Sequence, residues 1–429
     1  MVSSSASHMA GTQTVQGPLA GYRVLELGQL IAGPFCGQML GDMGAEVIKV
    51  EAPGVGDAMR QWGQVRPKGE SLWWSVVARN KKSVTLDLRT EDGRATVRHL
   101  VRSCDVVVEN FRPGRMDAWG LSYDDLAAVN PGVVMVRVSG FGQTGPYAHR
   151  AGFGAVGEAM GGLRYIVGEP SEPPVRTGIA IGDALAGMMG AYGALAALLE
   201  RERSGRGQQI DVAIYESVLA FMESLIPEYQ VAGHIRERTG GTLPGVAPSN
   251  VYPTADGVPV LIAANQDTVF RRLATAMGRP ELSQNPIYST HTARGNRQVE
   301  LDAIVAGWTA TIDSQQLVEL MADHGVPAGL IYRAPEMLTD PHFAARDAIV
   351  QVPHPQFGHV AMQNVIPRIS RTPGSIRWVG PRLGEHNDEI LGGLLGLSNE
   401  RVQALGAGYG DTRHDARSSP TPPPSREDE

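Results

Sequence analysis

The chain is poor in cysteine, with Cys36 and Cys104 as its two thiols in 429 residues. Two thiols cannot build a disulfide framework or a cysteine-rich metal site, and they indicate a reducing compartment, which we expect to be the cytoplasm. Both lie in apolar stretches, so we predict buried structural thiols rather than nucleophiles.

An excess of basic residues is also missing. The chain has 38 Lys and Arg against 45 Asp and Glu, which gives a net charge of −7. A nucleic-acid-binding protein would present a basic domain or stripe, so we expect no nucleic-acid partner. We find no run of about 18 apolar residues, and therefore expect no membrane span.

Common motifs for metal, phosphate and serine chemistry are absent: the chain has no HExxH, no CxxC, no GxSxG and no Gly-Lys step of a phosphate-binding loop. Residues 152–157 (Gly-Phe-Gly-Ala-Val-Gly) have the spacing of a dinucleotide-binding loop, but they follow a turn and not a strand. We therefore expect no metal site and no nicotinamide or flavin cofactor.

Short apolar runs alternate with helical segments through the first third of the chain. Such alternation is typical of βαβ units, and it predicts an α/β fold with a doubly wound, Rossmann-like parallel sheet. Near-continuous apolar runs indicate strands that are covered on both faces. The predicted strands are residues 23–27, 45–51, 83–88, 104–110 and 133–139.

Asp183 stands at the start of a long apolar helix predicted over residues 182–203. An aspartate in this position can cap the helix, because its carboxylate accepts hydrogen bonds from free backbone N–H groups. A carboxylate held at a helix N-terminus among small residues can also serve as a nucleophile. The local sequence leaves both roles open.

Several motifs, in order, resemble class III CoA-transferases, the family of formyl-CoA transferase and carnitine CoA-transferase. The resemblance covers residues 17–405. It is carried by residues 21–27 (GYRVLEL), 32–34 (AGP), 40–51 (LGDMGAEVIKVE), 80–84 (NKKSV), 109–114 (ENFRPG), 140–146 (GFGQTGP), 182–183 (GD) and 383–387 (LGEHN).

The resemblance implies that Asp183 is a covalent nucleophile for acyl transfer, with CoA as a substrate and no metal or redox cofactor. It also implies a CoA site. Ile31 takes the place of a glutamine found near the active site of formyl-CoA transferases, which weakens a formyl or oxalate assignment. The residues carried over to the CoA site are Ile31, Val77, Ala78, Arg79, Asn80, Asn110, Phe111, Arg112 and Arg115, with Lys81 and Lys82 as further cations.

For the acids, the resemblance points to succinyl-CoA as donor and a small dicarboxylate as acceptor, such as L-malate, citramalate, itaconate or glutarate. Arg150 or Arg176 can pair with a distal carboxylate, and a loop salt bridge is the other interpretation of each.

Racemases of the family carry a histidine where this chain has Phe153, so an α-methylacyl-CoA racemase is the weaker alternative. A catalytically silent acyl-CoA-binding protein is a second alternative.

The domain limits follow from composition and from the resemblance. We expect the enzyme to form an interlocked homodimer, as the resemblance implies. The predicted divisions are a disordered leader (1–16), the first part of a large CoA-binding domain (17–225), a small α/β domain (226–335), a return to the large domain (336–405) and a disordered tail (406–429).

Overall fold

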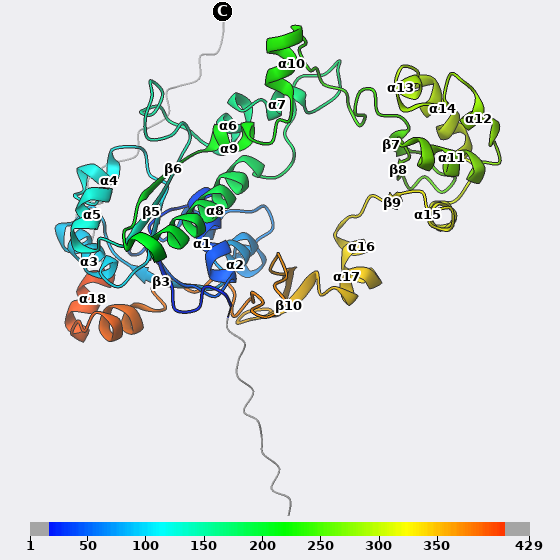
Figure 1. Ribbon diagram of the computed structural model, residues 1–429. Helices are drawn as coiled ribbons and strands as arrows, with labels where there is room; N and C mark the ends of the chain where they lie inside the picture. Colours follow the sequence, from blue (N-terminus) through cyan, green and yellow to red (C-terminus); the bar gives the residue numbers. More distant parts are fainter. Residues whose placement is uncertain (1–16, 408–429) are drawn as a thin grey trace, which may run out of the picture.

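The computed structural model describes residues 17–407 (Figure 1). The leader predicted over 1–16 lies outside the described residues, as does nearly all of the tail predicted over 406–429. The last described helix, α18 (Asn399–Ala407), continues through the first two residues assigned to that tail.

A six-stranded, fully parallel sheet forms the large domain, with strand order β3-β2-β1-β4-β5-β6. The prediction of a doubly wound α/β sheet is confirmed. Each predicted run overlaps a strand, although β3 begins two residues before the run predicted over 83–88. Apolar residues on both sides of these strands meet helices. The strands are β1 (Arg23–Glu26), β2 (Glu46–Glu51), β3 (Lys81–Thr85), β4 (Val106–Glu109), β5 (Val134–Ser139) and β6 (Gln209–Ala213).

Neighbouring residues of one strand enter different cores. In β1, Val24 packs in the core beneath α1 and α8, whereas Leu25 packs in the core beneath α3 and α5. Figure 1 shows these helix pairs on opposite sides of the sheet. The helices of this part are α1 (Ala32–Asp42), α2 (Leu72–Val77), α3 (Glu91–Val101), α4 (Arg115–Ala118), α5 (Tyr123–Val129), α6 (Gly154–Met160), α7 (Leu163–Ile166), α8 (Ile181–Ser204), α9 (Ile214–Leu219) and α10 (Leu225–Ala232), with short 3₁₀ turns at Ala58–Gln61 and Pro67–Gly69.

From the sequence we expected no apolar run long enough to span a membrane, and α8 shows that this expectation is wrong. By length and composition its 24 residues qualify as a candidate span. One side of the helix packs against α1, β5 and β6, as the core helix of a globular domain does. The other side leaves Tyr192 and Leu199 each 71% exposed.

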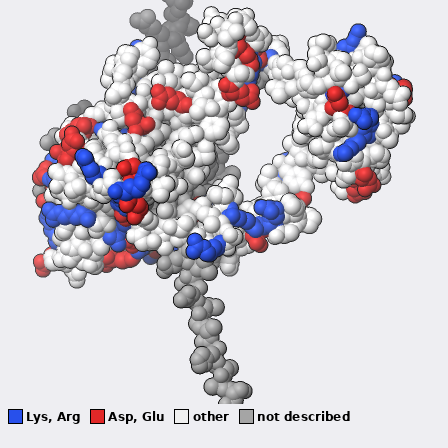
Figure 2. Space-filling view, viewed as in Figure 1, with Lys and Arg blue, Asp and Glu red and all other residues white. Residues whose placement is uncertain are grey.

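A smaller unit follows, with its own antiparallel sheet of order β7-β8-β9 and its own core. Figure 1 shows it beside the large domain, joined to it by two chain segments. In Figure 2 an opening remains between the two bodies. The elements are β7 (Ser249–Tyr252), β8 (Val260–Ala263), β9 (Ala328–Leu330), α11 (Asp267–Ala276), α12 (Glu281–Gln284), α13 (His291–Gly295), α14 (Gln298–Thr309) and α15 (Ser314–Asp323).

The chain then returns to the large domain. Ile390, Leu391, Val402 and Leu405 fill the core beneath α3 and α5. Residues 390–405 therefore complete a core begun at β1. The elements of the return are α16 (Ala334–Thr339), α17 (Pro341–Ala345), the hairpin β10 (Ile349–His354) and β11 (Gly358–Gln363), a π-helical turn (Asp388–Leu394) and α18.

Arg294 holds the small unit together from within. Its fully buried guanidinium donates to the carbonyls of Ala247, Tyr288 and Asn265, and forms an ion pair of 2.7 Å with Asp267. Lysine cannot reproduce this forked set of contacts.

We expect Arg294→Lys to lower the free energy of unfolding by about 2–4 kcal/mol, because it leaves buried carbonyls unpaired. Thermal and denaturant unfolding measure the loss. Arg297→Lys is the matched control, because that side chain is 50% exposed in its pair with Glu300. Equal stability of the two variants would contradict the role given to Arg294.

Candidate active site

Asp183 lies in the first turn of α8 but does not cap it. The N-cap residue is Ala180, and no side chain caps the helix. Among residues 17–407, no hydrogen bond reaches the Asp183 carboxylate, although the side chain is half-buried. The capping interpretation is therefore wrong, and the carboxylate is left free for chemistry.

Gly154, the first residue of α6, provides the space for this carboxylate. A Cβ atom at position 154 would lie 2.3 Å from Oδ2 of Asp183. In the same cavity, the backbones of Gly140 and Gly152 approach each other so closely that a Cβ on either residue would lie 2.7 Å from the Cα of the other. Glycines thus allow backbone to surround the carboxylate without covering it.

The environment disfavours the ionised form of Asp183. Burial, together with the negative charge of Glu158, raises the pKa of Asp183 to about 6, and Arg176 opposes the shift. Perturbed carboxyl groups of this kind cluster at functional sites. Near neutral pH the group is still mostly ionised, as a nucleophile must be.

A cavity of about 250 Å³ contains Asp183 at the carboxyl ends of β1, β4 and β5. In this sheet the strand order turns between β1 and β4, where ligands of open α/β sheets bind. Of the predicted residues, Ile31, Asn110, Phe111, Arg112 and Phe153 line the cavity with Asp183. The other lining residues are Gln29, Leu30, Ala32, Trp62, Val138, Ser139, Gly140, Ala151, Gly152 and Ile214.

Asn110 shapes one wall of the cavity. Its amide group accepts a hydrogen bond from the Gln29 N–H (2.7 Å) and donates one to the Gln29 carbonyl (2.8 Å). The next residue, Leu30, has φ +64°, which is rare for a leucine, and its N–H donates to Asp57. Asn110 therefore positions the loop that carries Ile31.

A buried cluster of charges supports the same loop. The Lys49 ammonium lies between Glu26 (3.0 Å) and Asp57 (2.8 Å), and donates to the Gly28 carbonyl. Burial alone would lower the pKa of Lys49, but these carboxylates raise it above its usual value. Lys81, predicted as a phosphate-binding cation, is fully buried here against Glu26 (2.8 Å), so it faces no ligand.

Arg79 and Asn80 bind partners within the protein, and Arg79 also lines a separate cavity of about 670 Å³ beside Ile181 and Ala184, so their place in a CoA site stays a prediction. Arg79 forms a buried ion pair with Asp42 (2.6 Å) and donates to the Gln363 carbonyl, while the Asn80 amide donates to Asp42 and to the Ser375 carbonyl. Their polar groups thus attach the C-terminal return to α1 and do not enter the cavity around Asp183.

The remaining predicted CoA-site residues do not line that cavity. Ala78 is buried in one cluster with Ile31, Met59 and Trp74, and Val77 is half-buried beside it. Lys82 pairs with Glu46 and Glu389. Arg115 is exposed in α4, with its guanidinium 5.5 Å from the ring of Trp119.

The two predicted carboxylate clamps are on exposed loops. Arg150 stacks on Tyr147, with 3.7 Å between the guanidinium carbon and the ring centre. Arg176 is exposed and forms no side-chain hydrogen bond or ion pair among the described residues, but its charge acts on Asp183. Neither arginine lines the cavity, and neither forms the loop salt bridge considered from the sequence.

Sequence reasoning missed Gln29, Trp62, Ser139 and Glu158. Ser139 ends β5, and its buried hydroxyl has no hydrogen-bond partner in the described part of the chain. The sequence could have indicated Ser139 through its position at the end of an apolar strand, because the ends of parallel strands meet at one edge of the sheet. The sequence indicated Glu158 as a site residue only weakly, through its position four residues after Gly154.

The two thiols are buried, as predicted, and burial raises the pKa of each. They are therefore poor nucleophiles. Within residues 17–407 no group of three or more His, Cys, Asp and Glu side chains is arranged to hold a metal ion. That the reaction needs no metal or redox cofactor stays a prediction.

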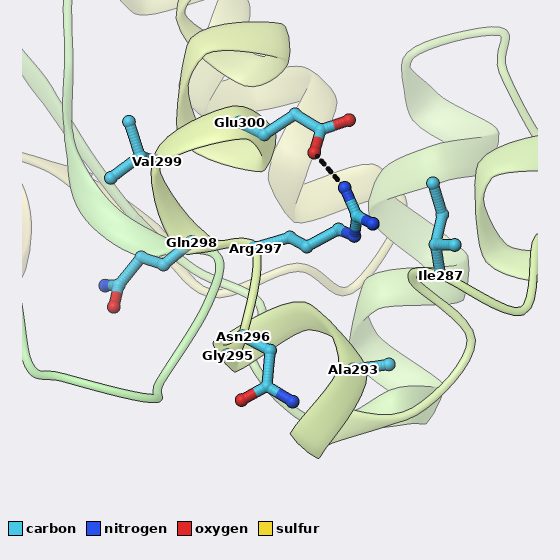
Figure 3. A pocket seen from close by; sticks show the side chains of 8 residues that line it. All are labelled: Ile287, Ala293, Gly295, Asn296, Arg297, Gln298, Val299 and Glu300. Carbon is cyan, nitrogen blue, oxygen red and sulfur yellow. Dashed lines mark hydrogen bonds and ion pairs between the residues drawn. The ribbon is translucent and has the colours of Figure 1, made fainter.

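A larger hollow, of about 810 Å³, lies on the small unit (Figure 3). It is open to solvent beside the start of α14, and an Arg297–Glu300 ion pair crosses it at 2.9 Å. It contains none of the predicted site residues. Size alone therefore does not identify a reactive site.

Known proteins match most of the length of this chain. A succinyl-CoA–D-citramalate CoA-transferase of Chloroflexus aurantiacus is 60% identical over 390 residues, which cover 91% of this chain and 97% of that protein. A succinate–glutarate CoA-transferase of Agrobacterium fabrum is 38% identical, over 88% of this chain and 96% of its own length.

The solved structure of a CaiB/BaiF family protein from Brucella suis superposes with a TM-score of 0.79 at 35% identity, and covers 88% of this chain and all of that one. Residues 19–387 match the family described as CoA-transferase family III. The chain belongs to this family and is a class III CoA-transferase.

Proposed function

We propose that this enzyme transfers CoA from succinyl-CoA to a short dicarboxylic acid, with citramalate as the first candidate, through a covalent intermediate on Asp183. The observation that carries the proposal is the half-buried Asp183 carboxylate, which has no hydrogen bond among the described residues and faces the cavity at the strand ends. The relative at 60% identity, named for succinyl-CoA and D-citramalate, supports this choice of acids.

The proposed reaction conserves the thioester in four steps. A carboxylate oxygen of Asp183 attacks the thioester carbon of succinyl-CoA, the C–S bond breaks, and CoA thiolate leaves. The thiolate attacks the aspartyl carbonyl of the mixed anhydride, and succinate leaves as a carboxylate. The acceptor carboxylate then attacks the aspartyl–CoA thioester and releases thiolate, which attacks the acceptor's acyl carbon and frees Asp183.

Residues around the cavity have distinct parts in this proposal. Ile31 and Phe111 give apolar walls that exclude water, which would otherwise hydrolyse the anhydride, whereas Phe153 is 64% exposed at the rim. Arg112, exposed at the rim, is suited to a phosphate or a distal carboxylate. Arg176 is placed by its effect on Asp183 to attract an anionic substrate.

Racemisation is the less suitable activity for this site. Exchange of the proton on Cα requires an acid or base on each side of the carbon. Phe153 occupies the place of the racemase histidine and lines the cavity, and His149 is exposed and does not line it. Asp183 has no second base opposite it in the described cavity lining.

A homodimer is part of the proposal. The apolar side of α8, with Tyr192, Leu195 and Leu199 exposed, and the opening between the two bodies in Figure 2 are features that a second, interlocked copy would cover and fill. We also propose cytoplasmic action without a metal or redox cofactor.

The proposal is tested by incubating the purified enzyme with succinyl-CoA and labelled succinate. We expect label to enter succinyl-CoA, because the half-reaction is reversible. A panel of citramalate, L-malate, itaconate and glutarate should then give the corresponding CoA thioesters, citramalate fastest. CoA binding without exchange would instead support the silent binder, and deuterium uptake at Cα of a 2-methylacyl-CoA would support a racemase.

A further inference from the structure

Glu158 is a second buried carboxyl group beside Asp183. It follows Gly154 by four residues in α6, so both face the same neighbour, the first turn of α8. Its Oε1 lies 3.3 Å from the backbone nitrogen of Gly182, which donates to it. A Cβ at Gly182 would lie 2.9 Å from Cγ of Glu158, so glycine is what allows the approach.

The positive charges near these two carboxylates are few. Glu158 is 1% exposed and pairs with Arg164 from α7 at 3.3 Å. Asp183 is influenced by Arg176 from the exposed loop before α8. On the side of Asp183, α1 presents Ala32 and α9 presents Ile214. Further charged side chains line a separate cavity beside Ile181 and Ala184, namely Asp42, Arg79, Arg346, Asp347 and Arg368.

A buried carboxylate so near a nucleophile is costly for the resting enzyme, because like charges in a low-dielectric region repel each other. Glu158 cannot be needed only to satisfy the Gly182 N–H, since a neutral oxygen would accept that bond equally well. Its charge forms the ion pair with Arg164, and it also acts on the nearby carboxylate of Asp183.

We propose that Glu158 is a positioning residue that acts through Asp183: its fixed negative charge destabilises the free Asp183 carboxylate relative to the neutral acyl-aspartyl species. This inference rests on the proposed function. When a carboxylate oxygen of Asp183 bonds to the thioester carbon, the C–S bond breaks and its electron pair leaves with CoA thiolate. The side chain becomes neutral, and its repulsion with Glu158 ends.

The test is Glu158→Gln, which keeps the shape and the acceptor oxygen but removes the charge. In the wild type, activity should be lost as pH falls through about 6, because protonated Asp183 is not a nucleophile. In the variant we expect this acid limb to move down by about one pH unit, and kcat at neutral pH to fall about 3- to 10-fold, because a less destabilised carboxylate is a weaker nucleophile. Glu158→Asp, which keeps the charge, should restore much of the wild-type profile.

Glu172→Gln is the matched control, an exposed glutamate on the loop that carries Arg176. It should leave the profile unchanged. The titration of Asp183 is also followed directly by difference infrared spectroscopy against Asp183→Asn, which needs no substrate. If the wild type exchanges no CoA, the proposed function fails while this titration still reports on Glu158. An unchanged Asp183 titration in folded Glu158→Gln overturns the inference.

Discussion

Asp183→Asn is expected to reduce CoA exchange by at least about 10³-fold, because the amide preserves the shape of the side chain but is not a nucleophile. We expect CoA affinity to stay close to that of the wild type, because Asp183 is one of many residues that line the cavity. Exchange of labelled succinate gives the rate, and calorimetric titration with CoA gives the affinity.

The stability of the same variant separates catalysis from structure. The Asp183 carboxylate caps no helix, and burial and Glu158 disfavour its charge. The variant should therefore be at least as stable as the wild type in thermal unfolding. A marked loss of stability would show that the carboxylate has a structural role after all.

Chemical trapping locates the intermediate. With succinyl-CoA and no acceptor, hydroxylamine should convert an acylated Asp183 to a hydroxamate, because an anhydride or thioester is a far better acyl donor than a free carboxylate. Peptide mass mapping should place the mark on the peptide that contains Gly182 and Asp183. A mark at Cys36 or Cys104, or no mark in active enzyme, would contradict the covalent mechanism.

Gly154→Ala should remove most activity without touching the reacting groups. The added methyl carbon would lie 2.3 Å from Oδ2 of Asp183, so the carboxylate must move by more than about 1 Å to restore van der Waals distance. A displacement of this size costs about 100-fold in rate. Initial rates at saturating succinyl-CoA measure it.

Gly307→Ala is the matched control for this substitution. Gly307 lies inside α14, and a Cβ there would meet nothing within 4 Å. Alanine should stabilise that helix by about 0.5–1 kcal/mol and leave the rate unchanged. Full activity of Gly154→Ala would mean that Asp183 does not need its observed position.

The sequence predicted the sheet well because its strands are short apolar runs whose partners lie on both faces. β1 and β5 were found in this way to within one residue. Asp183, Ile31 and Phe153 were found through family motifs, and the cavity does bring them together.

The sequence could not show where a side chain has a distant partner. It did not disclose that Arg79 pairs with Asp42, which lies 37 residues earlier in the chain. Lys81 was wrongly taken for a phosphate-binding cation, since Glu26 and the Pro34 carbonyl receive its ammonium group. Adjacent residues in a motif do not disclose such pairings, because only the folded sheet brings α1, β1 and β3 together.

The position of the last helix has a consequence for synthesis of the chain. The apolar residues beneath α3 and α5 are covered in part by Ile390, Leu391, Val402 and Leu405, which leave the ribosome after everything else in that core. The small unit has a core drawn from residues 247–330 alone, so it can close during translation. The synthesis of the large domain begins first, but part of its apolar core stays exposed to solvent until the C-terminal residues are made. Contacts between the two ends of the sequence slow the folding of this domain.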